Sequence, residues 1–469
     1  MEYVALSTVP AMRAAVAAGH PATTAAGIEI LEAGGTAADA AVAACLASCV
    51  AETVMTGLLG GGHAIYYDAG SGAVRNLDCF CAVPSGTGAP VVELDVPFGE
   101  ELVHYAVGAA SCAVPGVPAG LDALWRAYGR LPWTDLCAPA LRLACEGVPM
   151  PTAHVACLEM LEPVMTMREG ARIYAPAGRL LRESERLEQP GLVPALELVA
   201  DEGPATVYRG SIAESLLVLV AERGGAITRA DLEAYEAQWD DPVEASYAGT
   251  RFMTRGGLAR IAPAVERLPG LVDLDETART LALLDAVDGD GADGHTTNLV
   301  TVDGEGSACV LTTSLGLGSG DWLPGLDLHL NSMLGEIDLL VGPIEPGSRM
   351  QSMMAPSIAL GTDGPVLAIG AAGGTRLRTA LVGVASAILD VGAEPGEAVE
   401  QPRVHRAGTI VNAEPGADDG ALAELERRGL TVRRWAACHH YFGGVSLVAR
   451  GGPAADPRRS GAAALLESL

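Results

Sequence analysis

Apolar residues recur with a period near 3.6 in several segments of the chain, and this spacing predicts helices with a buried face. Other short segments alternate apolar and polar residues or are rich in β-branched residues, which predicts strands. The expected helices span residues 23–32, 37–49, 117–128, 133–145, 211–223 and 376–389. The expected strands span residues 64–67, 298–302, 308–313, 366–369 and 445–448. Sheets bounded by helices predict a layered α/β body.

The pattern does not divide the chain into separate domains. A chain of 469 residues can hold two or three average domains or one large α/β unit. Residues 151–244 follow mostly helical patterns, and no internal repeat stands out. Residues 252–293 are polar and acidic with many glycines and prolines, so we expect them to form a surface connection.

The composition excludes several classes of protein. Hydrophobic residues make up 49% of the chain and charged residues 19%. This composition is sufficient to form a hydrophobic core and is not typical of a disordered protein. The 30 basic and 58 acidic side chains give a net charge of -28, which repels phosphate backbones and anionic lipid headgroups. We therefore expect no nucleic-acid partner and no membrane partner.

Several local features predict a cytoplasmic protein. Glu2 and Pro10 stand where a secretory signal needs a basic start and an unbroken apolar run. The most apolar stretch, residues 36–50, contains Asp39 and is shorter than the roughly 20 residues that span a bilayer. The ten cysteines are scattered, as expected for buried thiols in a reducing compartment, and none has partners at the spacing of a zinc site. We expect no metal and no organic cofactor.

A β-hairpin is predicted between residues 295 and 314. If Gly304 and Glu305 form a two-residue turn, Thr296 lies opposite Thr313, and hydroxyl groups crowd one end of the strand. Threonine also suits strands, and paired hydroxyls are common packing. The hairpin by itself therefore does not establish a function.

Several glycine-rich and charged blocks stand in a fixed order along the chain. They occupy residues 20–28, 31–41, 57–63, 114–120, 128–133, 346–349, 370–376, 401–405 and 456–459. In this order they resemble the landmarks of the gamma-glutamyltranspeptidase family, from about residue 12 to residue 461. One glycine motif would be weak evidence, but this many in sequence order is strong.

The resemblance implies an α/β fold, the four-layer α-β-β-α sandwich of the N-terminal-nucleophile hydrolases. It also implies self-cleavage between His295 and Thr296, which gives a large-subunit region, residues 1–295, and a small-subunit region, residues 296–469, associated as one folded unit. Cleavage exposes an α-amino group beside the Thr296 hydroxyl. An amine with a pKa of roughly 7.7 to 8.0 can act as the base that a weak alcohol nucleophile lacks.

The same resemblance implies further catalytic residues. Ser314 matches a threonine that hydrogen-bonds the nucleophile, and Gly373 and Gly374 match the pair that forms the oxyanion hole. Residues 367–376 run from a predicted strand into a predicted helix, where main-chain N–H groups can approach an anion. A tight turn without a catalytic role would contain the same glycines, so the assignment depends on the family match. Such donors contribute roughly 2.7 to 4 kcal/mol to a transition state.

The substrate-binding residues depart from the family pattern. Phe80 stands where the family has an arginine that grips the α-carboxylate of the glutamyl group, and Gly316 replaces an asparagine. The serine pair that contacts the carboxylate becomes Ser352 and Met353. Losing one partner of a desolvated charge pair costs roughly 2 to 5 kcal/mol. We therefore expect weak recognition of an ordinary gamma-glutamyl group.

The amine-binding region of the family matches a segment that contains Ser332, Met333 and Glu336. Because the replacements run from polar to apolar, we expect an acyl pocket for a less charged, bulkier group, with Ser352 and Glu336 as the remaining polar ligands. Asn298 replaces a histidine of the family, and the large-subunit region is shorter than is usual before the nucleophile.

Three functions remain open on these residues. The first is a self-processing hydrolase or transferase for a small-molecule acyl donor, a tailoring enzyme of natural-product biosynthesis that cleaves an amide or C–C bond. Relatives in alkylproline-type antibiotic pathways are thought to hydrolyse a C–C bond. The second is a gamma-glutamyl transferase or glutathione hydrolase in which another arginine replaces the clamp, and the third is a catalytically silent binding protein. We favour the first, because Thr296, Ser314, Gly373 and Gly374 are retained.

Overall fold

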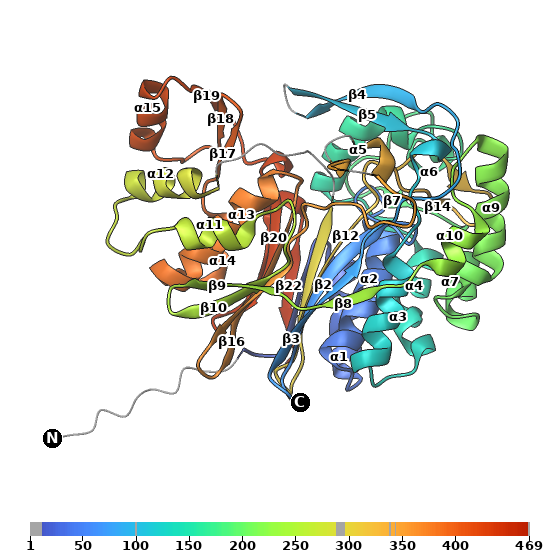
Figure 1. Cartoon of the computed structure of the whole chain (residues 1–469), viewed down its shortest axis with the longest axis horizontal. Coiled ribbons are helices and arrows are strands. Elements are labelled where there is room, and N and C mark those ends of the chain that lie inside the picture. The colour runs from blue at the N-terminus through green and yellow to red at the C-terminus, as the bar shows by residue number, and fades with distance from the viewer. Residues whose placement is uncertain (1–11, 99–100, 288–295, 337–338, 343, 468–469) are drawn as a thin grey trace.

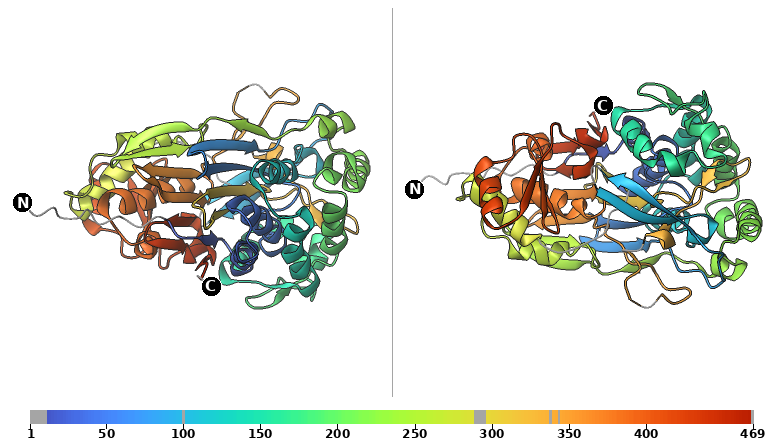
Figure 2. Two further views of the ribbon diagram at one scale, coloured as in Figure 1. Left: turned by 90° about the horizontal axis from the view of Figure 1, so that it is seen from below. Right: turned by 90° about the horizontal axis from the view of Figure 1, so that it is seen from above.

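The computed structural model describes residues 12–98, 101–287, 296–336, 339–342 and 344–467 (Figure 1). Two antiparallel sheets lie face to face in the middle of the molecule. Helices from the first half of the chain cover the outer side of one sheet, and helices from the second half cover the outer side of the other (Figure 2). This order of layers confirms the α-β-β-α sandwich that the resemblance implies.

The first sheet has seven strands and contains the expected hairpin. In spatial order they are β22 (Ala462–Leu465), β1 (Ala15–Ala18), β11 (Thr297–Val302), β12 (Ala308–Ser314), β2 (Gly61–Asp68), β3 (Ala73–Cys79) and β8 (Gln238–Asp240). The helices on its side of the molecule are α1 (Pro21–Glu32), α2 (Ala37–Ala51), α3 (Val117–Tyr128), α4 (Trp133–Glu146), α5 (Thr152–Met165), α6 (Gly170–Tyr174), α7 (Leu192–Asp201), α8 (Thr206–Arg209), α9 (Ser211–Arg223) and α10 (Arg229–Ala234). The apolar cluster between sheet and helices joins Leu299 and Leu311 to Leu46 of α2.

The second sheet has six strands. In spatial order they are β21 (Gly452–Ala455), β20 (Gly444–Ala449), β16 (Gly364–Ala372), β15 (Ser357–Gly361), β10 (Thr250–Thr254) and β9 (Val243–Tyr247). The helices on its side are α11 (Ile261–Arg267), α12 (Glu276–Ala286), α13 (Arg376–Ser386), α14 (Pro395–Glu400) and α15 (Asp419–Arg427), and a π-helical turn, η4 (Ala387–Val391), continues α13. Ile369 of the sheet and Leu381 of α13 belong to the cluster that joins these layers.

A third apolar cluster fills the space between the two sheets. Val300 and Val310 from the hairpin pack there with Ile358 and Val448 from the opposite sheet. Side chains alternate along a strand, so the hairpin buries one set of residues toward α2 and the other set toward the second sheet. The hairpin is therefore held from both sides.

Shorter elements surround the sandwich. The short strands are β4 (Val92–Phe98), β5 (Glu101–Val107), β6 (Val148–Pro149), β7 (Arg186–Leu187), β13 (Trp322–Leu323), β14 (Leu328–His329), β17 (Val404–Ala407), β18 (Ile410–Ala413) and β19 (Thr431–Arg434). The short 3-10 helices are η1 (Ala109–Ser111), η2 (Met333–Gly335), η5 (His440–Phe442) and η6 (Pro457–Arg459).

All six expected helices and all five expected strands are confirmed, with ends that differ by a few residues. The expectation of a surface connection over residues 252–293 is wrong for residues 252–287, and residues 288–293 lie outside the described residues. Strand β10 lies inside the second sheet between β9 and β15, with Phe252 fully buried, and α11 buries Ile261 against the same core. The apolar runs in this segment are too short to show a period, and the glycines and prolines around them hide the two helices.

The register of the hairpin differs from the expected one by a single residue. Thr297 pairs with Thr313, so the two-residue turn predicted at Gly304 and Glu305 is wrong. The carboxylate of Asp303 accepts the N–H groups of Glu305 at 3.0 Å and Ser307 at 2.9 Å, which stabilises a longer loop. This local capping by an aspartate competes with the tighter turn.

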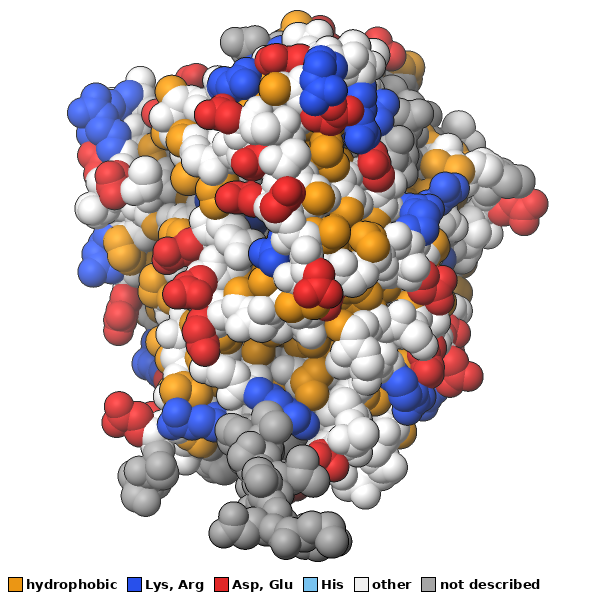
Figure 3. All heavy atoms as spheres, turned by 90° about the vertical axis from the view of Figure 1, so that its left-hand side faces the viewer, with side chains coloured by type: hydrophobic (Ala, Val, Ile, Leu, Met, Phe, Trp, Pro, Cys, Tyr) orange, Lys and Arg blue, Asp and Glu red, His pale blue; other side chains and the backbone are white. Residues whose placement is uncertain are grey.

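The outer face over the second sheet carries acidic and basic side chains interspersed with apolar ones (Figure 3). Among the described helices, none is both long enough and apolar enough to cross a membrane.

Candidate active site

A pocket lies at one edge of the two sheets, where β1 and β16 end and β11 and β20 begin. Thr296, the expected nucleophile, lines this pocket and is 6% exposed. The other lining residues are Gly19, Glu52, Met55, His154, Thr297, Asn298, Ala372, Gly444, Val445, Ser446, Asp456, Arg459 and Gly461. His295, on the far side of the expected cleavage, lies outside the described residues. Residues from both expected subunit regions thus meet around Thr296.

Ser314 faces the position of the nucleophile. Because Thr297 pairs with Thr313, one further step along the ladder places Thr296 opposite Ser314. By strand alternation, Thr296 is directed to the same face as Asn298, which is the face toward the second sheet. The expected hydrogen bond between Ser314 and the nucleophile stays a prediction.

Asn298, which departs from the family pattern, connects the nucleophile strand to its neighbours. Its Oδ1 accepts a hydrogen bond from the Thr312 hydroxyl at 2.7 Å, and its Nδ2 donates to the carbonyl of Ser446 at 3.5 Å. The Ser446 hydroxyl donates back to the Asn298 carbonyl at 3.3 Å. A Cβ on Gly370 would lie only 2.6 Å from Cγ of Asn298, so the asparagine fills space that a glycine leaves open.

The turn between β16 and α13 has backbone conformations that favour glycine, with φ of +127° at Gly373 and +57° at Gly374. A Cβ on Gly373 would lie 2.7 Å from Cα of Gly443. Within the described residues, neither Gly373 nor Gly374 donates its N–H to a protein acceptor. Uncommitted N–H groups directly after Ala372, which lines the pocket, have the property that an oxyanion hole requires.

Glu52 follows α2 and is buried beside the start of β11. Its carboxylate accepts hydrogen bonds from the Thr23 hydroxyl at 2.6 Å and from the Thr297 hydroxyl. Burial raises the pKa of Glu52 to about 7, although both hydrogen bonds and the charge of Arg459 act in the opposite direction. A Cβ on Gly19 would lie 2.5 Å from Oε2 of Glu52, so the carboxylate is enclosed at close range.

Arg459 brings a buried cation to the same pocket. Its Nη1 lies 3.4 Å from Sδ of Met55, and its Nε has no acceptor among the described residues. The side chain packs on Gly444, where an added Cβ would lie 3.0 Å from Cβ of Arg459. A Cβ on Gly373 would lie 3.2 Å from Nη2, so the guanidinium is close to the glycine turn. Burial lowers the pKa of Arg459, but a guanidinium stays charged at neutral pH.

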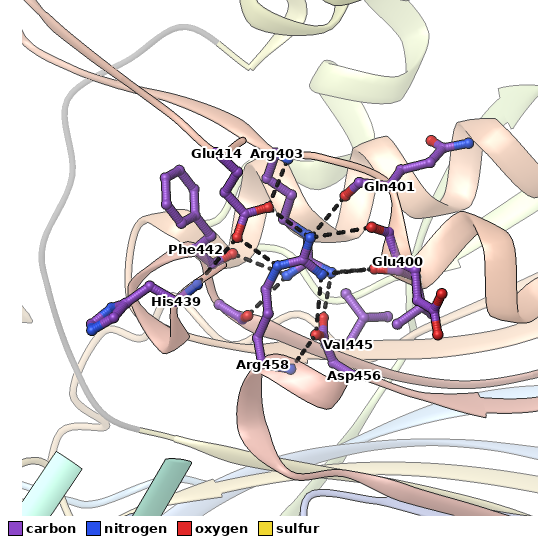
Figure 4. Close-up of polar contacts among 11 residues, drawn as sticks. Glu400, Gln401, Arg403, Glu414, His439, Phe442, Val445, Asp456 and Arg458 are labelled. Carbon is purple, nitrogen blue, oxygen red and sulfur yellow. Dashed lines mark hydrogen bonds and ion pairs between the residues drawn. The ribbon is translucent and has the colours of Figure 1, made fainter. Parts of the chain in front are cut away.

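A buried ionic network holds η6 against the beginning of β20 (Figure 4). Arg458 donates to Glu414 from Nε at 2.7 Å and from Nη2 at 2.6 Å, and to Asp456 from Nη1 at 3.2 Å. Arg403 donates to the other oxygen of Asp456, which also accepts the N–H of Val445 at 3.1 Å. Two family-like blocks that are distant in the sequence therefore fix one wall of the Thr296 pocket.

The three apolar replacements Phe80, Met333 and Met353 pack in one buried cluster. Its other members are Cys81, Val83, Ala113, Leu339, Met350 and Met354. The Phe80 ring stacks on the imidazole of His63, with centroids 5.4 Å apart. The structure thus brings together three residues that the sequence could only place on separate segments. None of the three is among the residues that line the Thr296 pocket in the described part of the chain.

Gly316 lies against Glu336 and Ser332, two of the expected substrate-binding residues. Its φ is +68°, and a side chain there would collide with the Glu336 carboxylate and come within 2.8 Å of Oγ of Ser332. The Gly316 N–H donates to Oγ of Ser314 at 2.8 Å, and the Leu317 N–H donates to Oγ of Ser332 at 3.1 Å. A side chain at position 316 is therefore incompatible with the present positions of Glu336 and Ser332.

An arginine that the family pattern does not predict lies beside Ser352. Nη1 of Arg255 donates to the Ser352 carbonyl at 3.2 Å, and Oγ of Ser352 accepts the Met354 N–H at 3.1 Å. Burial lowers the pKa of Arg255, and the charge of Asp78 opposes this shift. A guanidinium is thus present next to Ser352 and Met353, although position 80 is apolar.

Sequence reasoning missed Glu52, Arg255 and Arg459. The sequence could have indicated Glu52, because this acid follows a helix of mostly small, apolar residues. A charge buried there without a partner would be costly, which points to a specific role. Arg459 belongs to a block that matches the family, but the block does not show which of its arginines faces a pocket. Arg255 lies in the segment that was expected on the surface, and no local pattern marks it.

Sequence similarity to known proteins extends over most of the chain. The gamma-glutamyltranspeptidase family model matches residues 23–262 and 265–466. The glutathione hydrolase proenzyme of Bacillus subtilis is 25% identical over 500 residues, which covers 88% of this chain and 84% of that protein. The acylase ACY 1 proenzyme of Pseudomonas sp. (strain SE83) is 27% identical over 510 residues, which covers 93% of this chain and 90% of that protein.

A solved structure shares the fold. The crystal structure of cephalosporin acylase from Bacillus halodurans superposes with a TM-score of 0.81 at 23% identity, covering 98% of this chain and 97% of that chain. The family match extends over nearly the whole chain and includes Thr296 and every strand of both sheets except β1. The chain therefore belongs to the gamma-glutamyltranspeptidase family, and it is a hydrolase or acyltransferase of the N-terminal-nucleophile class.

Proposed function

We propose that this enzyme cleaves its own chain before Thr296 and then uses Thr296 to hydrolyse or transfer an acyl group. The observation that carries the proposal is the position of Thr296, at the head of a central strand and in the pocket beside the Gly373 turn. The new α-amine takes the hydroxyl proton, the oxygen attacks the acyl carbonyl, and the N–H groups of Gly373 and Gly374 receive the oxyanion. The bond to the leaving group then breaks as that group takes the proton from the α-ammonium, and water or an amine acceptor releases the acyl group from Thr296.

The pairing of strands supports association of the two fragments after cleavage. Strand β1, from residues 1–295, is hydrogen-bonded between β11 and β22, which both come from residues 296–469. Strands β2 and β10 also pair with strands of the second fragment, β12 and β15. Because each sheet contains strands from both fragments, separating them would break both sheets and expose the core. The proenzyme names of the two relatives are in keeping with such processing.

We propose an acyl group that is bulkier and less charged than a gamma-glutamyl group. The support is the buried cluster of Phe80, Met333 and Met353 in place of polar family residues. An apolar wall favours an apolar acyl chain by about 25 cal/mol for each Å² that it buries. A role in tailoring a natural product, by cleavage of an amide or C–C bond, is in keeping with such an acyl group.

A gamma-glutamyl transferase or glutathione hydrolase is the second candidate. The specific observation in its favour is Arg255, whose guanidinium lies beside the Ser352 and Met353 segment. In this alternative Arg255 binds the substrate carboxylate and Glu336 binds its amine. Glu336 is close enough to Gly316 to exclude any side chain there.

The first experiment tests the nucleophile. Freshly purified protein is expected to give two fragments that meet at Thr296 in denaturing electrophoresis and intact-mass measurement, and Thr296→Ala is expected to stay a single inactive chain. An uncleaved wild-type chain that turns over no acyl donor would instead identify a silent homologue. Full turnover by Thr296→Ala would refute the assignment.

The second experiment tests the acyl group. Cleaved enzyme is assayed with gamma-glutamyl-p-nitroanilide and with a phenylacetyl anilide of the same leaving group. We expect a higher kcat/KM for the phenylacetyl donor, and a shift toward the gamma-glutamyl donor in Met353→Ser. Met350→Ser, in the same cluster, controls for general loosening of the pocket. A wild-type preference for gamma-glutamyl that Arg255→Met abolishes would establish the second candidate.

A further inference from the structure

Glu52 is a buried acid of the nucleophile pocket to which the proposed chemistry gives no role. It contacts the strand of the nucleophile across 245 residues of sequence, through the hydroxyl of Thr297. Its other oxygen accepts the Thr23 hydroxyl of α1 at 2.6 Å. Both oxygens therefore accept a hydrogen bond from a buried threonine, and the acid links α1, the end of α2 and the first residue of β11.

The surroundings of Glu52 leave it little freedom to move. A Cβ on Gly19 would lie 2.5 Å from Oε2 of Glu52 and 2.8 Å from Oγ1 of Thr297, so this hydrogen bond is packed directly against the backbone. The Glu52 carbonyl accepts the N–H groups of Met55 at 2.7 Å and Thr56 at 3.0 Å, which orders the turn that follows α2. The position of Thr297 is thus defined by a rigid partner.

Protonation changes what this partner can do. An ionised carboxylate accepts from both threonine hydroxyls, whereas a protonated carboxyl carries a donor on one oxygen and keeps full acceptor capacity only on the other. One of the two threonine hydroxyls must then reverse or lose its bond. Protonation of Glu52 therefore changes the hydrogen bond that holds Thr297, the residue directly after the nucleophile.

We propose that Glu52 is a positioning residue that, in its ionised form, holds Thr297 and thereby keeps Thr296 in the orientation for attack. This proposal rests on the proposed function, because the activity of Thr296 as the nucleophile is what reveals the influence of Glu52. The pKa of about 7 for Glu52 puts the change between the two forms near neutral pH. Protonation of Glu52 then lowers kcat/KM toward acid pH, in addition to the fall that protonation of the nucleophile's own α-amine causes. We call this fall the acid limb of the pH profile.

The groups that face Glu52 do not themselves change charge near neutral pH, so a titration in this range can be assigned to Glu52. Arg459 of η6 supplies the opposing positive charge, which lowers the pKa of Glu52. Burial lowers the pKa of His154 in α5 to about 3, so this imidazole is neutral in the same range. The thiol of Cys45 in α2 has a raised pKa and is also neutral. Asp456, the other acid of the pocket, accepts hydrogen bonds from Arg403 and Arg458.

The test compares the pH dependence of kcat/KM in the wild type and in Glu52→Gln, with the best donor of the screen. The amide keeps the shape and can accept from Thr297, but it does not titrate. For a pKa of about 7, only about 3% of Glu52 is ionised at pH 5.5. The ratio of Glu52→Gln to wild-type activity is therefore expected to rise about 30-fold from pH 8.5 to pH 5.5. An unchanged ratio would overturn the proposal.

Two threonines provide variants in case Glu52→Gln folds poorly. Thr297→Val removes the hydroxyl through which Glu52 acts. Like Glu52→Gln, it is therefore expected to remove the fall in kcat/KM that protonation of Glu52 causes at acid pH. Thr301→Val is the matched control, because Thr301 lies on the same face of β11 and loses a comparable bond, at 2.7 Å to the Ala37 carbonyl, but contacts no acid. Thr301→Val should keep the wild-type pH profile. Equal effects of both variants would indicate a purely structural role for Glu52.

A third variant predicts the direction of a shift. The Thr23 hydrogen bond lowers the pKa of Glu52, so Thr23→Val is expected to move its limb to higher pH. A purely structural role would lower activity equally at all pH values.

A measurement without turnover separates this proposal from the proposed function. In Thr296→Ala protein, the backbone amide signal of Thr297 is followed by NMR as a function of pH, with and without Glu52→Gln. A titration near neutral pH that Glu52→Gln abolishes supports positioning even if no acyl donor is found. If the pH dependence of the Thr297 signal is the same with and without Glu52→Gln, the proposal is overturned, but the proposed role of Thr296 is not affected.

Discussion

Replacement of Gly370 by alanine tests how the second sheet holds the strand of the nucleophile. A Cβ on Gly370 would lie 2.6 Å from Cγ and 2.7 Å from Nδ2 of Asn298, well inside van der Waals contact. Asn298 cannot turn away without losing the hydrogen bond that the buried Thr312 hydroxyl donates at 2.7 Å. We therefore expect Gly370→Ala to be destabilising although φ at this position is ordinary.

The magnitude follows from two costs. Overpacking a well-filled core costs about 1 to 3 kcal/mol, and a lost internal hydrogen bond costs about 1 kcal/mol. Gly370→Ala should thus lower the free energy of unfolding by about 2 to 4 kcal/mol. Asn298→Ala alone leaves the Thr312 hydroxyl without its acceptor, at about 1 to 3 kcal/mol. In the double variant the new methyl group occupies space that the amide has vacated, so the costs should not add.

Urea unfolding followed by tryptophan fluorescence measures the free energy of unfolding of the two single variants and the double variant. We expect the double variant to be about 1 to 3 kcal/mol more stable than the sum of the single effects predicts. Gly383→Ala is the control, because this glycine of α13 has open space around an added Cβ and should gain about 0.4 to 1 kcal/mol. Additive costs at Gly370 and Asn298 would refute the proposed clash.

Two further predictions concern buried charges. Asp456→Ala leaves the guanidinium groups of Arg403 and Arg458 without a shared carboxylate, and should lower the free energy of unfolding by about 3 to 5 kcal/mol in urea titrations. A loss below about 1 kcal/mol would show that Glu414 alone compensates both cations. The pKa of Glu52 rises on folding from 4.5 to about 7, so ionisation of this group opposes folding. Wild-type stability relative to Glu52→Gln should fall by about 3 kcal/mol between pH 4.5 and pH 7, and a constant difference would contradict the raised pKa.

The candidate site could be predicted only in part. The family-like blocks led to Thr296, Ser314, Gly373 and Gly374, whose roles stay predictions, and to the apolar replacements at Phe80 and its partners. The structure adds that Phe80, Met333 and Met353 form one cluster. It also adds an arginine, Arg255, beside Ser352. Neither fact follows from spacing, because these residues lie on segments that meet only in the folded chain.

The sequence by itself determined six of the helices, five of the strands and the layered α/β architecture, because the period of apolar residues reports which face of each element is buried. Tertiary structure alone decided the register of the hairpin, where the carboxylate of Asp303 stabilises a longer loop. It also decided that residues 250–254 form a strand inside the second sheet. The hydrogen bond between Glu52 and Thr297, which are 245 residues apart in the sequence, was likewise decided only by the tertiary structure. Such contacts depend on how distant segments pack, and a local pattern carries no information about that distance.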